Sequence, residues 1–207
     1  MKYKIIEDYL DELIPNPTCE LNYTSDYTLL ISIVLSAQTT DKRVNEVTKI
    51  LFNKYPSLES LVNASINDIK KIIKPIGNFN KKAEYVKDIA SKLHHEYNDI
   101  VPDDEDSLLT FKGVGRKTVN VFLAEYKNIP RIAVDTHVSR VSKRLNLSNE
   151  NDNPLIIEEK LMKIFPREDW GKRHLQLVLF GRYYCKAKKP ECDNCNLKAI
   201  CRYYQEK

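Results

Sequence analysis

The sequence predicts an all-α protein. Apolar residues recur at three- and four-residue spacing along nearly the whole chain, which places them on one face of successive helices. The strict alternation of apolar and polar residues that marks a half-buried strand is absent. With 207 residues, 42% of them hydrophobic, the chain can form one large or two small helical domains with buried cores.

Three helices are expected in the N-terminal part. Apolar residues at helical spacing in 5–14 predict the first, which ends at Pro15. Ser25 is a candidate N-cap for the second helix, because its hydroxyl can accept from a backbone amide in the first turn. Either Thr39 or Thr40 can cap the third in the same way.

Further helices follow in the middle and C-terminal parts. Ser65 begins a sequence that resembles a capping box, so a helix is expected to start there. A long helix is expected over 81–97, and another begins near Arg116. Asn153 followed by Pro154 is a favourable helix start, with a polar cap and a proline at the first helical position.

Four of the five cysteines stand close together near the end of the chain. Their spacing is C-x6-C-x2-C-x5-C, and they are Cys185, Cys192, Cys195 and Cys201. Four thiolates in so short a run can surround one soft metal centre, either a single Zn²⁺ or a [4Fe–4S] cluster. An odd cysteine count with clustered thiols fits metal binding in a reducing compartment better than a set of disulfides.

The N-terminal sequence and the hydropathy predict a soluble intracellular protein. No apolar run is long enough to span a bilayer. Glu7 and Asp8 follow the first apolar pair and interrupt any signal-peptide core. We therefore expect the protein to be cytoplasmic or, if it binds DNA, associated with the nucleoid.

Charge is unevenly distributed along the chain. The net charge is only +4, but residues 111–207 carry 20 Lys and Arg against 11 Asp and Glu, whereas residues 1–110 carry 13 against 18. A basic half favours a polyanionic partner, of which nucleic acid is the simplest. Surface lysines that serve only solubility would give the same composition, so charge alone does not decide between the two.

The sequence Gly113-Val114-Gly115 lies between two predicted helical segments. Glycine permits positive φ and close backbone approach, and the N-terminus of the next helix presents amide donors and a partial positive charge. Such a turn can bind phosphate. It is not a Rossmann or P-loop motif, because no strand precedes it. It resembles a helix–hairpin–helix, which grips a DNA backbone; an ordinary tight turn is the alternative.

Lys117 and Asp135 are candidate catalytic residues. Lys117 lies in the first turn of the helix that follows the hairpin, where the dipole disfavours positive charge, so it is a candidate amine nucleophile. A lysine that contacts phosphate would occupy the same position. Asp135 precedes another predicted helix, so it is a candidate N-cap as well as a candidate charged group.

Several motifs in one order resemble the endonuclease III family. They are LSAQTTD at 35–41, FKGVGRKT at 111–118, VDTHV at 134–138, GRYYC at 181–185 and the cysteine run. The resemblance covers essentially the whole chain and implies a base-excision repair DNA glycosylase with AP lyase activity. Its substrates would be oxidised or saturated pyrimidines in damaged double-stranded DNA. We expect a monomer that does not bind a membrane.

The resemblance also implies an architecture. The chain would adopt the helix–hairpin–helix DNA glycosylase fold, with two helical domains flanking a DNA-binding groove. A six-helix domain with the hairpin would span 20–130. Residues 1–19 plus 131–207 would form a discontinuous helical domain that holds an iron–sulfur cluster.

Roles for single residues follow from the same resemblance. Lys117 would attack the sugar C1′ and form a Schiff base, and Asp135 would assist lysine activation and stabilise positive charge on the sugar. The four cysteines would hold a [4Fe–4S] cluster. The DNA-binding residues would be Gln38, Gly113, Val114, Gly115, Arg116, Lys186, Lys188 and Lys189. Gln38 would fill the space left by the flipped nucleotide.

Three residues depart from the family pattern. Lys112 stands where proline is usual, and Phe180 replaces a common histidine. Asn78 stands where an apolar side chain often wedges into the duplex, which leaves the lesion range and the opposite-base preference open. Two other functions stay open as well. One is a monofunctional mismatch glycosylase of the same fold, which generally lacks a lysine at position 117. The other is a non-catalytic DNA-binding module with a structural metal such as zinc.

Overall fold

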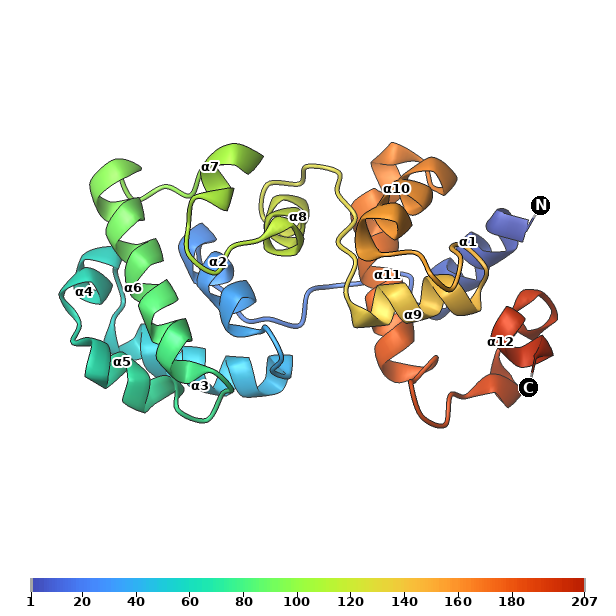
Figure 1. Cartoon of the computed structure of the whole chain (residues 1–207), viewed down its shortest axis with the longest axis horizontal. Helices are drawn as coiled ribbons and strands as arrows, with labels where there is room; N and C mark the ends of the chain where they lie inside the picture. The colour runs from blue at the N-terminus through green and yellow to red at the C-terminus, as the bar shows by residue number, and fades with distance from the viewer. Residues whose placement is uncertain (1, 207) are drawn as a thin grey trace. The chain divides into compact units, whose positions relative to one another are not determined.

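The computed structural model describes residues 2–206, and all regular structure in this range is helical (Figure 1). The absence of strands from these residues confirms the all-α prediction. Within the same range, no helix combines the length and the apolar character needed to cross a bilayer. The internal contacts divide the chain into two compact units, Cys19–Lys127 and a second unit assembled from Met1–Thr18 and Asn128–Lys207.

The unit Cys19–Lys127 is built around one buried helix. Its helices are α2 (Asp26–Leu35), α3 (Asp41–Lys54), α4 (Leu58–Asn63), α5 (Ile66–Ile73), α6 (Phe79–Glu96), α7 (Glu105–Leu109) and α8 (Arg116–Glu125). Helix α2 packs against α3, α6 and α8 (Figure 1), and every residue from Thr28 to Leu35 is buried. A helix that is apolar on all sides belongs in the centre of a core. Its packing therefore fixes the position of α8, which carries the candidate nucleophile.

The second unit is built around α11. Its helices are α1 (Lys2–Leu13), α9 (Thr136–Arg144), α10 (Pro154–Ile164), α11 (Trp170–Tyr183) and α12 (Arg202–Gln205), with 3₁₀ turns at Arg167–Asp169, Cys192–Asn194 and Lys198–Ile200. Helix α11 packs against α9 and α1. Gly181 permits the close approach of α11 to α9, because a Cβ there would lie 2.9 Å from the Cβ of His137.

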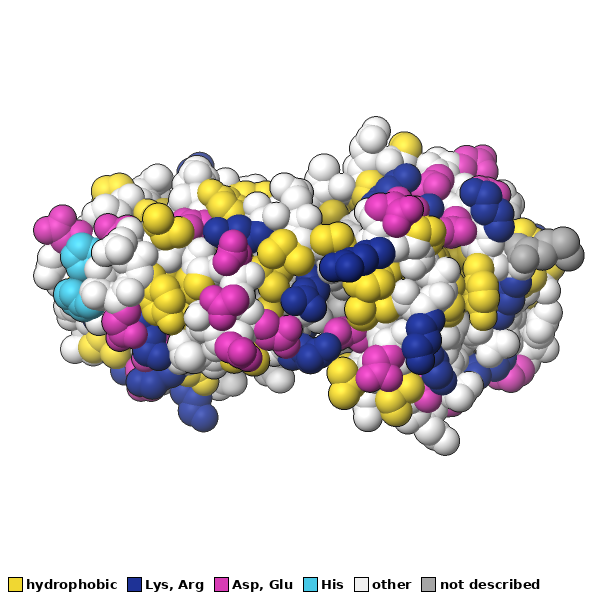
Figure 2. Space-filling model, turned by 90° about the horizontal axis from the view of Figure 1, so that it is seen from above, with side chains coloured by type: hydrophobic (Ala, Val, Ile, Leu, Met, Phe, Trp, Pro, Cys, Tyr) yellow, Lys and Arg dark blue, Asp and Glu magenta, His cyan; other side chains and the backbone are white. Residues whose placement is uncertain are grey.

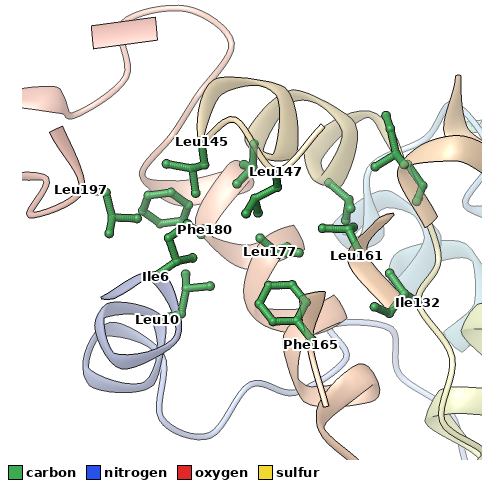
Figure 3. Close-up of a cluster of buried hydrophobic side chains, with 14 of the residues drawn as sticks. Ile6, Leu10, Ile132, Leu145, Leu147, Leu161, Phe165, Leu177, Phe180 and Leu197 are labelled. Carbon is green, nitrogen blue, oxygen red and sulfur yellow. The ribbon is translucent and has the colours of Figure 1, made fainter. Parts of the chain in front are cut away.

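One apolar cluster joins the segments of this second unit (Figure 3). Helix α1 contributes Ile6 and Leu10, and α11 contributes Leu177 and Phe180. Leu197, which lies between the third and fourth cysteines, is also fully buried in the cluster. Burial of a leucine side chain stabilises a fold by about 1.5–3 kcal/mol. Leu197 therefore anchors the cysteine run to the core of its unit.

Polar caps set several helix starts as the sequence predicts. Ser25 caps α2 in a reciprocal capping box, Thr40 caps α3, and Asn153 caps α10. The capping box expected at Ser65 is wrong, because its side chain accepts no cap hydrogen bond. Asp68, the acidic partner of that box, accepts instead from two side chains at the end of α3.

Candidate nucleic-acid interface and metal-binding segment

The hairpin turn before α8 is fixed by side chains of α6. Gly113 has a φ of +80°, and a Cβ there would lie 2.4 Å from a ring atom of Tyr85, so only glycine fits. The backbone N–H of Lys112 donates to Asp88 Oδ2 at 2.9 Å, and its ammonium group lies 3.3 Å from the other oxygen. The packing of Tyr85 and the backbone bond hold the turn without a proline at position 112, and the exposed ammonium group adds little to them.

Gly115 differs from Gly113 in what it requires. Its φ of −115° suits any residue, and a Cβ there would meet no atom within 4 Å. Gly115 is the N-cap of α8 and offers no side chain to the first turn. Lys117 is the second residue of α8 and is exposed. The start of α8 thus combines an N-terminus open to an anion with an exposed amine.

Val114 and Arg116, the other two hairpin residues predicted to contact DNA, differ in exposure. Val114 is buried, so it can contact DNA only through its backbone. Arg116 is exposed, and its guanidinium lies 3.4 Å from Glu105 Oε1 in α7. A phosphate near Arg116 would therefore compete with a carboxylate.

Gln38 and Asn78 occupy exposed turns of the same unit. Gln38 lies between α2 and α3 with a φ of 55°, and Asn78 precedes α6 with a φ of 57°. Asparagine tolerates the left-handed region better than most residues with a side chain. This gives a backbone reason for an asparagine where the family pattern led us to expect an apolar residue.

Asp135 is the N-cap of α9 in the second unit. Its Oδ1 accepts a hydrogen bond from the backbone N–H of Val138 at 2.8 Å. Among residues 2–206, its Oδ2 makes no hydrogen bond. The capping interpretation is therefore correct, and it leaves one carboxylate oxygen for chemistry.

The four predicted ligands, Cys185, Cys192, Cys195 and Cys201, line one cavity of about 280 Å³. Within residues 2–206, no three His, Cys, Asp or Glu side chains are grouped closely enough to hold a metal ion. Four thiols around one cavity are the donor set of a [4Fe–4S] cluster and also of a tetrahedral zinc site.

Two of these thiols are poorly suited to ionise alone. Burial raises the pKa of Cys195 and of Cys201 above the ordinary value. Metal binding displaces thiol protons, so it would supply the missing stabilisation of both thiolates.

Arg144 holds the segment that starts at the first cysteine. Its guanidinium donates to the carbonyl oxygens of Lys186 at 2.7 Å and Ala187 at 3.3 Å, and it lies 3.4 Å from Cys185 Sγ. It also stacks on the ring of Tyr203, 4.0 Å from the ring centroid. A planar fork that bonds two consecutive carbonyls fixes the path of the loop after Cys185.

The loop between the first two cysteines carries the three predicted DNA-binding lysines. Lys186 is paired with Glu191 at 2.7 Å. Lys188 and Lys189 are exposed, and no salt bridge to either occurs among the described residues. Two of the three lysines therefore present their charge to solvent.

Sequence reasoning missed the structural roles of Arg140, Arg144 and Lys82. Arg140 donates to the carbonyl oxygens of Cys185 at 3.1 Å and Gly181 at 2.6 Å. The two arginines stand four residues apart on α9, and basic residues near a helix C-terminus are a usable signal. Lys82 gave no such signal. A lysine in a helix normally faces water, and nothing in the sequence marks Lys82 as buried.

The distribution of charge alone does not identify a DNA-binding surface. On the face shown in Figure 2, lysine and arginine side chains lie among acidic ones in both units. Backbone geometry at the hairpin and exposure of particular lysines are therefore the more specific signals.

Comparison with known proteins identifies the family. The HhH-GPD superfamily of base excision DNA repair proteins matches residues 31–167. Endonuclease III of Bacillus subtilis (strain 168) is 40% identical, over 97% of this chain and 91% of its own length. A structure of a trapped endonuclease III–DNA covalent intermediate superimposes with a TM-score of 0.94 at 41% identity, covering 100% of this chain and 98% of the other. The chain belongs to the endonuclease III family.

Membership confirms the predicted fold and the general activity. The protein is a DNA-binding base-excision repair glycosylase of a family with AP lyase activity. A thermostable thymine-DNA glycosylase also superimposes, with a TM-score of 0.88 at 25% identity, over 100% of this chain and 98% of its own. The roles of single residues and the cofactor stay predictions.

Proposed function

We propose that this endonuclease III relative excises oxidised or saturated pyrimidines, such as thymine glycol, from duplex DNA and then cleaves the strand. The supporting observation is Lys117, an exposed amine in the first turn of α8, directly after a turn that only glycine can form. A related endonuclease III has been trapped as a covalent intermediate with DNA, which supports a covalent route. We infer that it acts as an intracellular monomer.

Lys117 would act on a nucleotide that has left the base stack. The neutral amine attacks the sugar C1′, the bond from C1′ to the base breaks, and the base leaves with the electron pair and a proton. The sugar ring then opens: the C1′–O4′ bond breaks, O4′ takes a proton, and the C1′=N iminium of the Schiff base forms. This iminium makes a C2′ proton acidic. Loss of that proton expels the 3′ phosphate and breaks the strand by β-elimination.

Asp135 would supply the negative charge that this chemistry needs. Its Oδ1 is engaged by Val138 N–H, so Oδ2 is the atom to accept a proton from the lysine or to stabilise positive charge on the sugar. An oriented charge at a reacting centre is worth about 10²–10³ in rate. Since the cap orients the carboxylate, the structural and chemical roles of Asp135 support each other.

The DNA backbone would be bound by two segments. The first is the hairpin, through backbone groups of Gly113, Val114 and Gly115 and the side chain of Arg116. The second is the cysteine loop, through Lys188, Lys189 and a Lys186 released from Glu191. Gln38 would occupy the space left in the duplex by the flipped nucleotide.

We also propose that the four cysteines hold a [4Fe–4S] cluster. With four cysteine ligands the irons have no open position for water, so the bound cluster would supply structural organisation and no hydrolytic chemistry. Its role would be to fold the lysine loop whose carbonyls Arg144 already binds. A zinc protein would be colourless, whereas this one should absorb visible light and be brown.

The test is borohydride trapping on a duplex that contains thymine glycol. Lys117→Gln should form no adduct and cleave no strand, because an amine is required for the Schiff base, and it should still bind DNA. Lys112→Gln is the matched control: it removes an exposed lysine of the same hairpin and should trap at the wild-type rate. Asp135→Asn should keep the fold, because asparagine caps helices equally well, and slow base release by about 10²-fold.

The alternatives give different results in the same assay. An adduct with Lys117→Gln at the wild-type rate would mean that another amine is the nucleophile. Base release without any adduct in the wild-type protein would indicate a monofunctional glycosylase. Binding without base release would indicate a non-catalytic module.

A further inference from the structure

Two exposed turns of the unit Cys19–Lys127 depend on a left-handed residue with a side chain. Gln38 and Asn78 have φ values of 55° and 57°. A glutamine rarely adopts this region, because its Cβ approaches the following carbonyl oxygen. Such a backbone persists only where the surroundings fix it. The side chain that holds these two turns in place therefore indicates what the turns do.

Lys82 of α6 is bonded to both turns. Its ammonium group donates to the carbonyl oxygens of Leu35 at 2.9 Å and Ala37 at 2.7 Å and to Thr39 Oγ1 at 3.1 Å. These acceptors lie on either side of the left-handed glutamine. Lys82 stands one helical turn after Asn78, and its backbone N–H makes the first regular bond of α6, to the Asn78 carbonyl oxygen at 3.0 Å. All three ammonium protons are thus used, and one residue joins the two turns.

Lys82 is more deeply buried than is usual for a lysine. It is 4% exposed, and no carboxylate among residues 2–206 forms a salt bridge with it. Burial lowers its pKa from the ordinary lysine value. A buried cation without a counter-ion is unfavourable, and a shorter polar residue could cap the end of α2. What the long side chain adds is its reach across the whole turn to three acceptors.

We propose that Lys82 is a positioning residue that locks the Gln38 turn to the Asn78 turn, so that both enter the duplex as one rigid element when the damaged nucleotide is extruded. This inference rests on the proposed function, in which Gln38 fills the vacated space. Lys82 acts on the opening of the paired duplex. It does not touch DNA, and it does not change the grip on the phosphate backbone.

The same helix provides a matched control. Lys87 lies five residues further along α6, and its ammonium group also caps a helix end. It donates to the carbonyl oxygens of Leu61 at 3.2 Å, Ala64 at 2.9 Å and Val62. Its acceptors belong to the end of α4, where no residue has a positive φ. Lys82→Met and Lys87→Met therefore remove the same chemical group, but only the first loosens a proposed DNA-inserting turn.

The experiment compares single-turnover base excision on two duplexes. In the first, thymine glycol is paired with adenine; in the second, an abasic analogue replaces the adenine, so the lesion is already unpaired. Lys82→Met should slow excision from the paired duplex by about ten- to a hundredfold, the scale for displacing a positioning group by about 1 Å. On the unpaired duplex it should stay within about threefold of wild type. Lys87→Met should stay within about threefold on both.

A double-mutant cycle tests the route of the effect. Gln38→Asn shortens the side chain and tolerates the left-handed backbone. It should slow excision from the paired duplex in the wild-type background and have little further effect with Lys82→Met, because residues that act together are not additive. Additive effects, or equal slowing on both duplexes, would overturn the proposal. Those results differ from failure of the proposed function, in which the wild-type enzyme excises nothing.

A weaker variant covers the case in which Lys82→Met does not fold. Thr39→Val removes only the side-chain acceptor of the turn and leaves the lysine in place. It should slow excision from the paired duplex by a few-fold and leave the unpaired duplex unchanged. Equal rates for Thr39→Val and wild type on the paired duplex would contradict the inference.

Discussion

Both units of this enzyme have a buried apolar core, but the second also contains a buried arginine ion pair and a cysteine-rich stretch with little regular structure. The unit Cys19–Lys127 has a fully buried apolar helix at its centre, and α3, α6 and α8 pack around it. In the second unit, α1 is tied to α11 by Arg173, which donates to Asp11 Oδ1 at 2.7 Å and Oδ2 at 3.1 Å. Its cysteine-rich stretch has only 3₁₀ turns and one short helix among the described residues, and Arg140 and Arg144 bind its carbonyls.

The ion pair and the thiols of the second unit should make it the more sensitive of the two to pH and to metal content. Apolar packing changes little with metal content or with pH between 3 and 8. Carboxylates titrate at the acid end of this range, so an ion pair with a guanidinium is lost when its carboxylate is protonated, and thiolates respond to the loss of a metal. We therefore expect metal loss and acid to act first on the second unit, while α2 and the helices packed around it keep their structure.

The largest effect should follow the loss of one cysteine ligand. Wild-type protein should contain about four irons per chain, as for one cubane cluster. Cys195→Ser should lose them and leave amides in 186–206 more open to hydrogen exchange, because the stretch is then held mainly by Leu197, a few neighbouring side chains and the arginines. Amides of α2 should keep their wild-type protection.

The control for this variant is the fifth cysteine. Cys19→Ser lies outside the run and should keep the full iron content. Four irons retained in Cys195→Ser would show that Cys195 is not a ligand. Equal loss of protection in α2 would show that the two units do not differ in the proposed way.

The sequence correctly predicts the features that neighbouring residues determine. The periodic apolar residues and the caps at Ser25, Thr40 and Asn153 predict helices correctly, because these signals are local. Ser65 fails because its expected partner is taken by residues of another helix. The fate of that carboxylate depends on tertiary packing, which a local motif does not contain.

The candidate site likewise contains residues that the sequence predicts and one that it does not. The family motifs contain Lys117, Asp135 and the four cysteines, so these positions are readable from the sequence. The burial of Lys82 is not readable, because its acceptors come from residues more than 40 positions earlier in the chain. Backbone carbonyls carry no residue identity, so a lysine that binds them from a distant helix leaves no pattern in the sequence.

A second, smaller effect compares two glycines of one turn. Gly113→Ala should destabilise the unit Cys19–Lys127 by about 2–4 kcal/mol, because it combines an unfavourable φ with an overpacked contact to Tyr85. Gly115→Ala should change stability by no more than about 0.5 kcal/mol, because its Cβ points into open space. It should instead weaken binding to damaged and undamaged duplex alike.

Denaturant unfolding and a binding titration separate the two glycine variants. If Gly115→Ala binds duplex DNA as tightly as wild type, no phosphate approaches the start of α8 closely. If Gly113→Ala is as stable as wild type, Tyr85 can move aside and the hairpin is less rigid than its contacts indicate.

The smallest predicted effect is a pH dependence confined to the second unit. Burial acts to raise the pKa of Asp11, but hydrogen bonds from Arg173, Lys172 and Gln176 hold it well below the ordinary range. A group with a lowered pKa in the folded state stabilises that state above its unfolded pKa of about 3.9, and this contribution is lost as the pH falls toward the folded value. Asp11→Asn should therefore lower stability by about 1 kcal/mol at pH 7 and equally at pH 5.

At pH 3 the difference between Asp11→Asn and wild type should shrink, because the wild-type stabilisation is then partly lost. The control is Asp8→Asn, which breaks an exposed pair with Lys4 on the same helix and should change stability little at any pH. Thermal unfolding at pH 7, 5 and 3 measures all three proteins. A difference for Asp11→Asn that is constant down to pH 3 would mean that its carboxylate contributes through shape alone, and the acid sensitivity assigned to the second unit would then need another group.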